Sequence, residues 1–229
     1  MRISCRRHLL LSILVLSFIA CSAKSALAWH SLVDRVKDGP AASSIREAYR
    51  LLEEGEASDS DATKLDLYAR GKNLAEQAVA IDANNAEAHF ALFATWGRWL
   101  QVDGWFKNSY RLPALWTELN RTLELDPVHP DALAAKGGLF LELPRLLGGD
   151  AGKAQGYLEQ AIKLDPDSVG ARFELAECYM LEDRREEARG LVNVGLRIAK
   201  EQRKAHYVRQ GDALLEKLGP ARFPQEAGL

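Results

Sequence analysis

Apolar residues recur at helical spacing in two stretches that are separated by a short polar loop. The first stretch predicts a helix that runs to about Glu56, with Ser43 and Ser44 as candidate caps for its start. The second stretch predicts a helix from about Thr63 to Ile81. The two apolar stripes are Ile45, Ala48, Tyr49 and Leu52, and then Leu65, Tyr68, Ala69, Leu74, Ala75, Ala78 and Ile81. Because no run alternates apolar and polar residues and β-branched residues are sparse, the pattern predicts an all-α chain.

Large and small residues follow a fixed order between Gly152 and Gly195, with small residues where two helices are expected to approach closely. In a unit that starts at Val169, positions 7, 8, 11, 20, 24 and 27 are Leu175, Ala176, Tyr179, Ala188, Val192 and Gly195. This order resembles the tetratricopeptide repeat, a helix–turn–helix unit of about 34 residues. The resemblance implies a solenoid of stacked antiparallel helix pairs.

Three similar junctions end the predicted pairs: Ile81-Asp82-Ala83, Leu125-Asp126-Pro127 and Leu164-Asp165-Pro166. Their spacings of 44 and 39 residues exceed a unit of about 34, so we expect insertions of about ten and about five residues. The sequence therefore predicts one tetratricopeptide-like domain over residues 29–219. Its helix pairs are expected at about 42–83, 86–127, 130–166 and 169–200, followed by a capping helix at 203–218 and a tail at 220–229.

The longer insertion falls in an aromatic stretch that holds four of the five tryptophans of the chain. The aromatic residues singled out there are Trp96, Trp99, Trp105, Phe106 and Trp116. One interpretation is that they close the hydrophobic core, because tryptophan and tyrosine bury large areas. The other is that they wall an apolar cavity for a small ligand, which needs several rigid aromatic faces around a few polar groups.

The shorter insertion runs from Leu143 to Asp150 and contains its own stop and start signals. Pro144 is expected to end the helix that begins near Pro130, and the two glycines before Asp150 allow backbone angles closed to other residues. The Asp150 carboxylate is expected to cap the next helix.

This Leu-Pro-x-x-Leu-Gly-Gly-Asp segment, followed by Lys153 and Ala154, resembles the periplasmic T component of TRAP transporters over roughly residues 82–188. That family consists of tetratricopeptide lipoproteins. The resemblance implies an apolar cavity and a partnership with the periplasmic solute-binding protein of a transporter for organic acids.

No motif of the sequence predicts catalysis, a metal or a cofactor. The histidines outside the first 28 residues are scattered, without a pair at i and i+4 or a nearby cysteine cluster, and no Gly-x-Ser-x-Gly elbow occurs. Gly148 and Gly152 do not form a phosphate loop, because only three residues separate them and Ala154 stands where a hydroxyl is required. We therefore expect a protein that is not an enzyme.

The first 28 residues have the three zones of an export signal. Arginines form the positive zone, and an apolar stretch from Leu9 to Ala20 follows, too short for a membrane span of about 20 residues. Two interpretations of its cleavage remain open. Ala26-Leu27-Ala28 predicts release of a soluble exported protein, with a signal peptide at 1–28. Phe18-Ile19-Ala20-Cys21 resembles a lipobox, which would remove residues 1–20 and attach a lipid to Cys21 for the outer membrane.

Removal of residues 1–28 takes away four basic residues and no acid, so the formal net charge changes from −2 to −6. This mildly acidic surface argues against a nucleic-acid partner, for which a basic face is expected. Cys178 is the one cysteine of the predicted folded part and is expected to be a small buried side chain.

The resemblance to tetratricopeptide repeats also implies a concave groove, lined by the first helix of each pair. Carried onto this sequence, the groove positions with side chains for contact are Phe90, Arg98, Leu141, Glu142, Phe173, Glu177, Met180 and Leu181. The apolar members would grip a partner, and the charged ones would select its polarity.

These observations leave two hypotheses of function. The first is an exported, non-catalytic adaptor of the cell envelope that binds a protein partner in the groove. The second is a periplasmic carrier, associated with a TRAP transporter, that binds a small apolar or amphipathic ligand in the aromatic cavity.

Overall fold

The computed structural model describes residues 32–104, 107–145 and 148–220 of the chain. Those ranges contain ten α-helices, one short 3-10 helix and no strand, which confirms the predicted all-α solenoid. The elements are α2 (Leu32–Arg35), α3 (Ala42–Ala57), α4 (Asp61–Ile81), α5 (Ala86–Asp103), η2 (Ser109–Arg111), α6 (Leu112–Leu125), α7 (Pro130–Glu142), α8 (Ala151–Leu164), α9 (Val169–Leu181), α10 (Arg185–Glu201) and α11 (Ala205–Leu218). The predicted signal peptide, Cys21, Trp105 and Phe106 lie outside the described residues.

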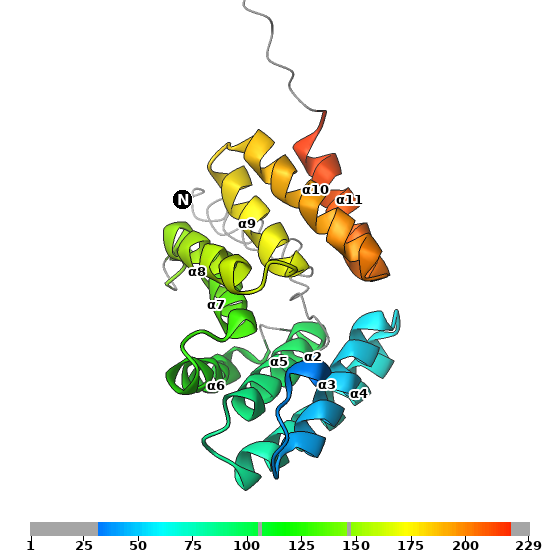
Figure 1. Cartoon of the computed structure of the whole chain (residues 1–229), viewed down its shortest axis with the longest axis vertical. Helices are drawn as coiled ribbons and strands as arrows, with labels where there is room; N and C mark the ends of the chain where they lie inside the picture. Colours follow the sequence, from blue (N-terminus) through cyan, green and yellow to red (C-terminus); the bar gives the residue numbers. More distant parts are fainter. Residues whose placement is uncertain (1–31, 105–106, 146–147, 221–229) are drawn as a thin grey trace, which may run out of the picture.

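The helices stack as neighbouring pairs along the chain. Figure 1 shows α3, α4, α5 and α6 at one end of the molecule and α9, α10 and α11 at the other, with α7 and α8 between them. Each helix packs on the next. Contacts also join α3 to α5, α7 to α9 and α9 to α11, which are the first helices of successive pairs and the final capping helix. The first helices of the pairs thus form one layer of the stack.

Short polar side chains cap the starts of α4, α5 and α8. Ser60, Asn85 and Asp150 each accept a hydrogen bond from the backbone N–H three residues later, at 3.1–3.3 Å. The cap predicted at Asp150 is therefore confirmed. The caps predicted at Ser43 and Ser44 are wrong, because α3 already begins at Ala42, and its first residues have no side-chain cap.

Small residues sit where helices meet, as the sequence pattern indicates. Ala154, Ala176 and Ala188 are fully buried. At Gly195 of α10, a Cβ atom would lie 2.5 Å from the ring of Phe173 on α9, so only glycine allows this contact. The register of small residues therefore decides how closely α9 and α10 approach.

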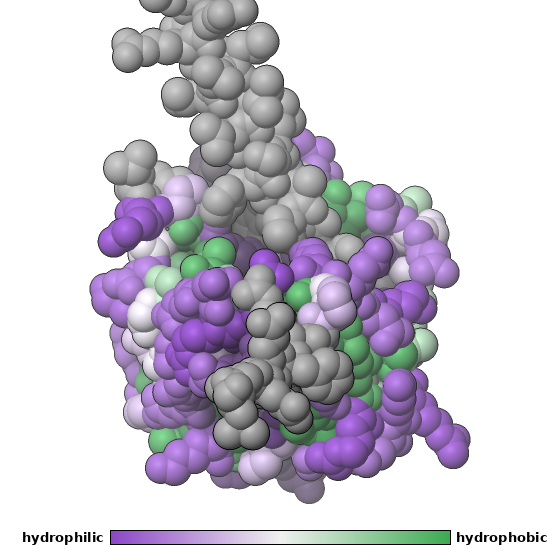
Figure 2. Space-filling model, turned by 90° about the horizontal axis from the view of Figure 1, so that it is seen from above, coloured by the Kyte–Doolittle hydropathy of each residue, from purple (hydrophilic) through white to green (hydrophobic). Residues whose placement is uncertain are grey.

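Three clusters of buried apolar residues form the core. One spans α2 to α6 and includes Ala132 and Ala135 of α7, the second joins α7, α8 and α9, and the third joins α9, α10 and α11. On the face seen in Figure 2, the described residues are mostly hydrophilic, with apolar residues in smaller groups between them.

Candidate protein-interaction groove

A small hollow opens on the layer of first helices, between α5, α7 and α9, with α6 behind it. Its walls are apolar, with Phe93 of α5, Leu115 of α6 and Leu139 of α7 among them. Gly97 and Gly138 leave the space between these walls. The hollow has a volume of about 50 Å³, which is room for a few waters or for the end of one side chain.

Polar side chains line the same hollow. Arg98 and Gln101 come from α5, Glu142 from the end of α7 and Glu174 from α9. Of these four, the sequence predicted Arg98 and Glu142 as groove residues. An apolar pocket with a few polar groups in it is the usual form of a recognition site.

Arg98 is held in place by other residues of the chain. Its guanidinium lies 2.8 Å from the carboxylate of Glu56 at the end of α3, and it donates a hydrogen bond of 2.9 Å to Gln101. Both members of the Arg98–Glu56 pair are about nine-tenths buried. Arg98 therefore joins α5 to α3 and presents a charge that is largely neutralised within the protein.

Glu174 is the residue of the hollow that the sequence analysis missed. Its side chain is 3% exposed, and a Cβ atom at Gly138 would lie 2.7 Å from its Oε2. Burial raises the pKa of Glu174 well above the usual value, and the charges of Glu142 and Glu177 raise it further, while Arg98 opposes them. The available signal was a lone acid between the core residues Phe173 and Leu175.

Two predicted groove residues are core residues instead. Phe90 and Phe173 have no exposed surface, so the partner contacts expected from them are not available in this structure. Phe90 stacks on Phe93 with ring centroids 5.9 Å apart, and it meets the ring of His129 at a tilt with centroids 4.6 Å apart. Phe173 meets Tyr207 of α11 edge to face. Both rings fill space between successive first helices, a packing that repeat position alone does not specify.

The remaining predicted groove residues lie at the surface or near it. Leu181, at the end of α9, is 71% exposed. Leu141, Glu142, Glu177 and Met180 are partly exposed. Glu142 is the one of these five that lines the hollow.

The aromatic stretch packs against the core rather than around the hollow. The side chains of Trp96, Trp99 and Trp116 are partly buried against the cluster that spans α2 to α6. Trp116 also meets Phe140 edge to face at 6.0 Å, and Phe140 stacks on Tyr157 of α8 at 5.7 Å. Phe93 is the aromatic residue among the described lining of the hollow. The described tryptophans of the aromatic stretch thus act in packing, whereas Tyr110 is 70% exposed.

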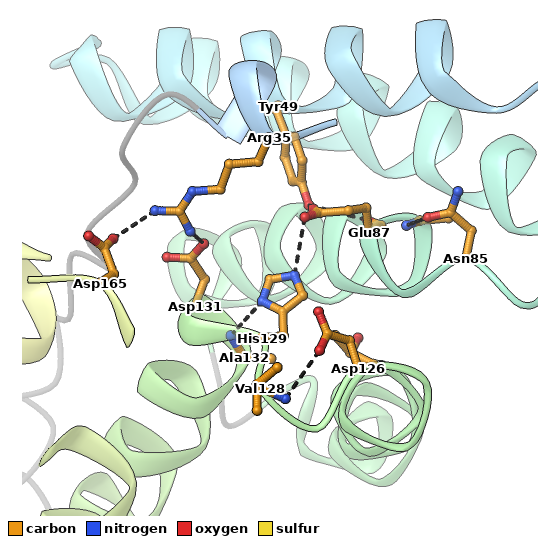
Figure 3. Close-up of polar contacts among 12 residues, drawn as sticks. Arg35, Tyr49, Asn85, Glu87, Asp126, Val128, His129, Asp131, Ala132 and Asp165 are labelled. Carbon is orange, nitrogen blue, oxygen red and sulfur yellow. Dashed lines mark hydrogen bonds and ion pairs between the residues drawn. The ribbon is translucent and has the colours of Figure 1, made fainter. Parts of the chain in front are cut away.

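A second polar cluster lies at the starts of α5 and α7 (Figure 3). The guanidinium of Arg35, from α2, is paired with Asp131 of α7 and lies 2.7 Å from Asp165 after α8. Tyr49 of α3 donates a hydrogen bond of 2.6 Å to the carboxylate of Glu87. His129 lies 3.5 Å from the same carboxylate and accepts a hydrogen bond from the N–H of Ala132, which caps α7.

Burial and charge oppose each other in this cluster. Burial raises the pKa of Asp131 to about 6, against the charges of Arg35 and His129. Burial also raises the pKa of Glu87, but the hydrogen bonds and charge of His129, with help from Tyr49 and Arg35, outweigh it and leave the pKa lowered. Asp131 is almost fully buried, so Arg35 is its main charge partner and fixes α2 to α7.

Residues 145–210 match the family model described as tetratricopeptide repeat. The fold is a tetratricopeptide-repeat solenoid. A thermophilic tetratricopeptide-repeat protein of Thermus thermophilus, TTC0263, is 19% identical, with a TM-score of 0.52 over 75% of this chain and 91% of its own.

Two further solved structures resemble this solenoid more distantly. The pilF protein of Pseudomonas aeruginosa is 17% identical, with a TM-score of 0.47 over 79% of this chain and 80% of its own. YrrB is 16% identical, with a TM-score of 0.43 over 74% of this chain and 86% of its own, and is described as a tetratricopeptide-repeat protein with an unusual peptide-binding site. No curated protein sequence matched this chain.

Membrane-spanning helices and metal-holding clusters are both absent from the described ranges. No helix there is both long and apolar enough to cross a membrane. Within the same ranges, no three His, Cys, Asp or Glu side chains gather in a way that would hold a metal ion. Cys178 is buried in α9, and burial raises the pKa of its thiol to about 12.

Proposed function

We propose that this chain is an exported, non-catalytic adaptor of the cell envelope that binds a segment of a partner protein at the hollow between α5, α7 and α9. The observation that carries this proposal is the combination of apolar walls with polar residues from three first helices, Arg98, Glu142 and Glu174 among them. Tetratricopeptide-repeat stacks use such concave surfaces for binding proteins.

The size of the hollow favours an adaptor over a carrier. A space of about 50 Å³ accepts the end of one side chain of a partner, whereas pockets for small organic molecules usually measure about 300–1,000 Å³. The described tryptophans are used in packing, so they leave no aromatic wall there. We therefore do not propose the carrier function, and a solute-binding protein remains one candidate partner for the adaptor.

The adaptor function is tested by photo-crosslinking in living cells. A benzophenone amino acid replaces Gln101, which lines the hollow and is partly exposed. The matched control carries the same amino acid at Lys163, an exposed residue of α8. A partner band that appears with the first variant and not with the second is expected. Equal labelling from both positions, or none, would contradict the proposal.

Export is part of the proposal and has its own test. Mass spectrometry of the protein isolated from cells should find a mature N-terminus at Trp29, or at a lipid-modified Cys21. An intact N-terminus that still begins at Met1 in the folded protein would refute the export of the adaptor.

A further inference from the structure

We propose that the hollow receives the side chain of a lysine or arginine from an extended basic segment of the partner, with Glu174 as the acceptor of its charged group. This inference rests on the proposed adaptor function and adds the chemistry of the recognised segment.

Glu174 has a carboxyl oxygen inside the hollow that receives no hydrogen bond from the described residues. Its side chain is 3% exposed, and its Oε2 has no hydrogen-bond partner among the described residues. A buried polar oxygen without a partner is costly, and a cation beside it would also stabilise the ionised form of the carboxyl group, which burial disfavours. A donor that enters from outside would remove this cost.

The apolar part of the hollow suits the last methylene groups of a long basic side chain. Phe93, Leu115 and Leu139 offer apolar walls on the way to Glu174. Lysine and arginine bury an aliphatic stem against apolar surface and carry their donors at the end. A short donor such as serine would contact neither the apolar walls nor Glu174.

The local charge favours a cation over an anion. Glu142 and Glu177 both act electrostatically on Glu174, and Arg98 is the opposing charge. Arg98 already lies 2.8 Å from Glu56, so much of its charge is balanced inside the protein. An acidic segment would meet two or three carboxylates and one neutralised guanidinium.

The chain itself shows this type of recognition at another place. Arg35 comes from α2, which precedes the repeats, and its guanidinium is bound by Asp131 of α7 and by Asp165. Glu142 belongs to the same helix as Asp131, and Glu174 lies on the helix that follows Asp165. Asp131 of this layer, together with Asp165 at the end of α8, thus already holds one basic side chain from outside the helix pairs.

The test uses nine-residue peptide libraries in which only the central residue is fixed, as Lys, Arg, Glu, Leu or Ser. Binding of each library to the purified full chain is measured by fluorescence anisotropy. The Lys or Arg libraries should bind best. Glu174→Gln keeps the shape of the side chain and removes its charge, so it should weaken their binding about tenfold, the factor that corresponds to about 1.4 kcal/mol. The matched control, Glu216→Gln, removes one exposed carboxylate of α11 and should leave binding unchanged.

The other outcomes separate this inference from the proposed function. Preference for Glu or Leu at the centre, or equal losses in both variants, would overturn the inference. Self-association of the chain that Glu174→Gln abolishes would also overturn it, because a second copy would then occupy the hollow. If no library is preferred while the crosslink from position 101 persists, the basic segment is wrong and the adaptor function stands. If the crosslink is lost as well, both the basic segment and the adaptor function are wrong.

Discussion

The C-terminal half of the molecule, α7 to α11, and the N-terminal half, α2 to α6, share close helix contacts but differ in their buried polar contacts. In the C-terminal half, small residues at repeat spacing let helices approach closely, as Gly195 does against Phe173. The N-terminal half also has close glycine contacts, such as Gly55 against the ring of Tyr68, and adds the buried ion pair of Arg98 and Glu56 between α5 and α3. Regular repeats and specific polar contacts can thus continue one stack, and the second kind leaves little trace in a repeat pattern.

Loss of Phe173 should be the largest effect. Phe173→Ala removes a fully buried ring between α9, α10 and α11, so the free energy of unfolding should fall by about 3–5 kcal/mol. Urea denaturation followed by circular dichroism measures this. Leu181→Ala, at a site 71% exposed, is the control and should change stability by no more than about 0.5 kcal/mol. If Phe173→Ala stays as stable as the control, the ring belongs to a surface.

Breaking the contact between the halves should have the next largest effect. Arg35→Ala leaves the buried Asp131 without its main charge partner, so stability should fall by about 2–4 kcal/mol at pH 7. The cost is somewhat below that of a fully buried pair because the Arg35 side chain is 25% exposed. The double variant Arg35→Ala/Asp131→Asn should recover part of the loss, and additive losses in this cycle would show that the two residues do not interact.

The raised pKa of Asp131 leads to a prediction for the pH dependence of stability. Its pKa is about 6 in the folded protein and about 3.9 in an unfolded chain, so the folded state binds the proton more tightly. This contribution to stability is fully present below pH about 4 and is lost as the pH rises through about 6. Relative to Asp131→Asn, the stability of the wild-type protein should therefore fall between pH about 4 and about 6. Above that range the two stability curves should run parallel. Denaturation curves from pH 4 to 8 measure the difference, and a constant difference would contradict the raised pKa.

Overpacking a contact of the C-terminal half should cost less. Ala188→Leu adds three carbon atoms at a fully buried position of α10 and should lower stability by about 1–3 kcal/mol. A thermal melt detects the loss. An unchanged melting temperature would mean that Ala188 does not face a neighbouring helix.

The smallest effect should be a gain. Gly190 also lies in α10, but a Cβ atom there would meet nothing within 4 Å. Gly190→Ala should therefore stabilise the protein by about 0.5–1 kcal/mol through the backbone alone. A loss of stability would show that the helix surface near Gly190 is more crowded than the structure has it.

The helices and their junctions could be predicted from the sequence, because periodicity, prolines and capping residues act locally. Asp150 is an example, since its cap depends on a residue three positions later. The burial of Phe173 could not be predicted, because it depends on the space that Gly195 and Gly211 leave on two other helices. Glu174 was missed for the same reason, since its setting depends on Gly138, which is 36 residues earlier in the chain. Long-range packing therefore decides which residues of a repeat are available to a partner.

A single substitution at Gly138 would be enough to change the charge that lines the hollow. The carboxylate of Glu174 can lie against α7 only because position 138 carries a hydrogen in place of a methyl group. One nucleotide change from a glycine to an alanine codon would displace that carboxylate without altering the order of the helices. Related chains could in this way acquire or lose a preference for charge while they keep the same scaffold.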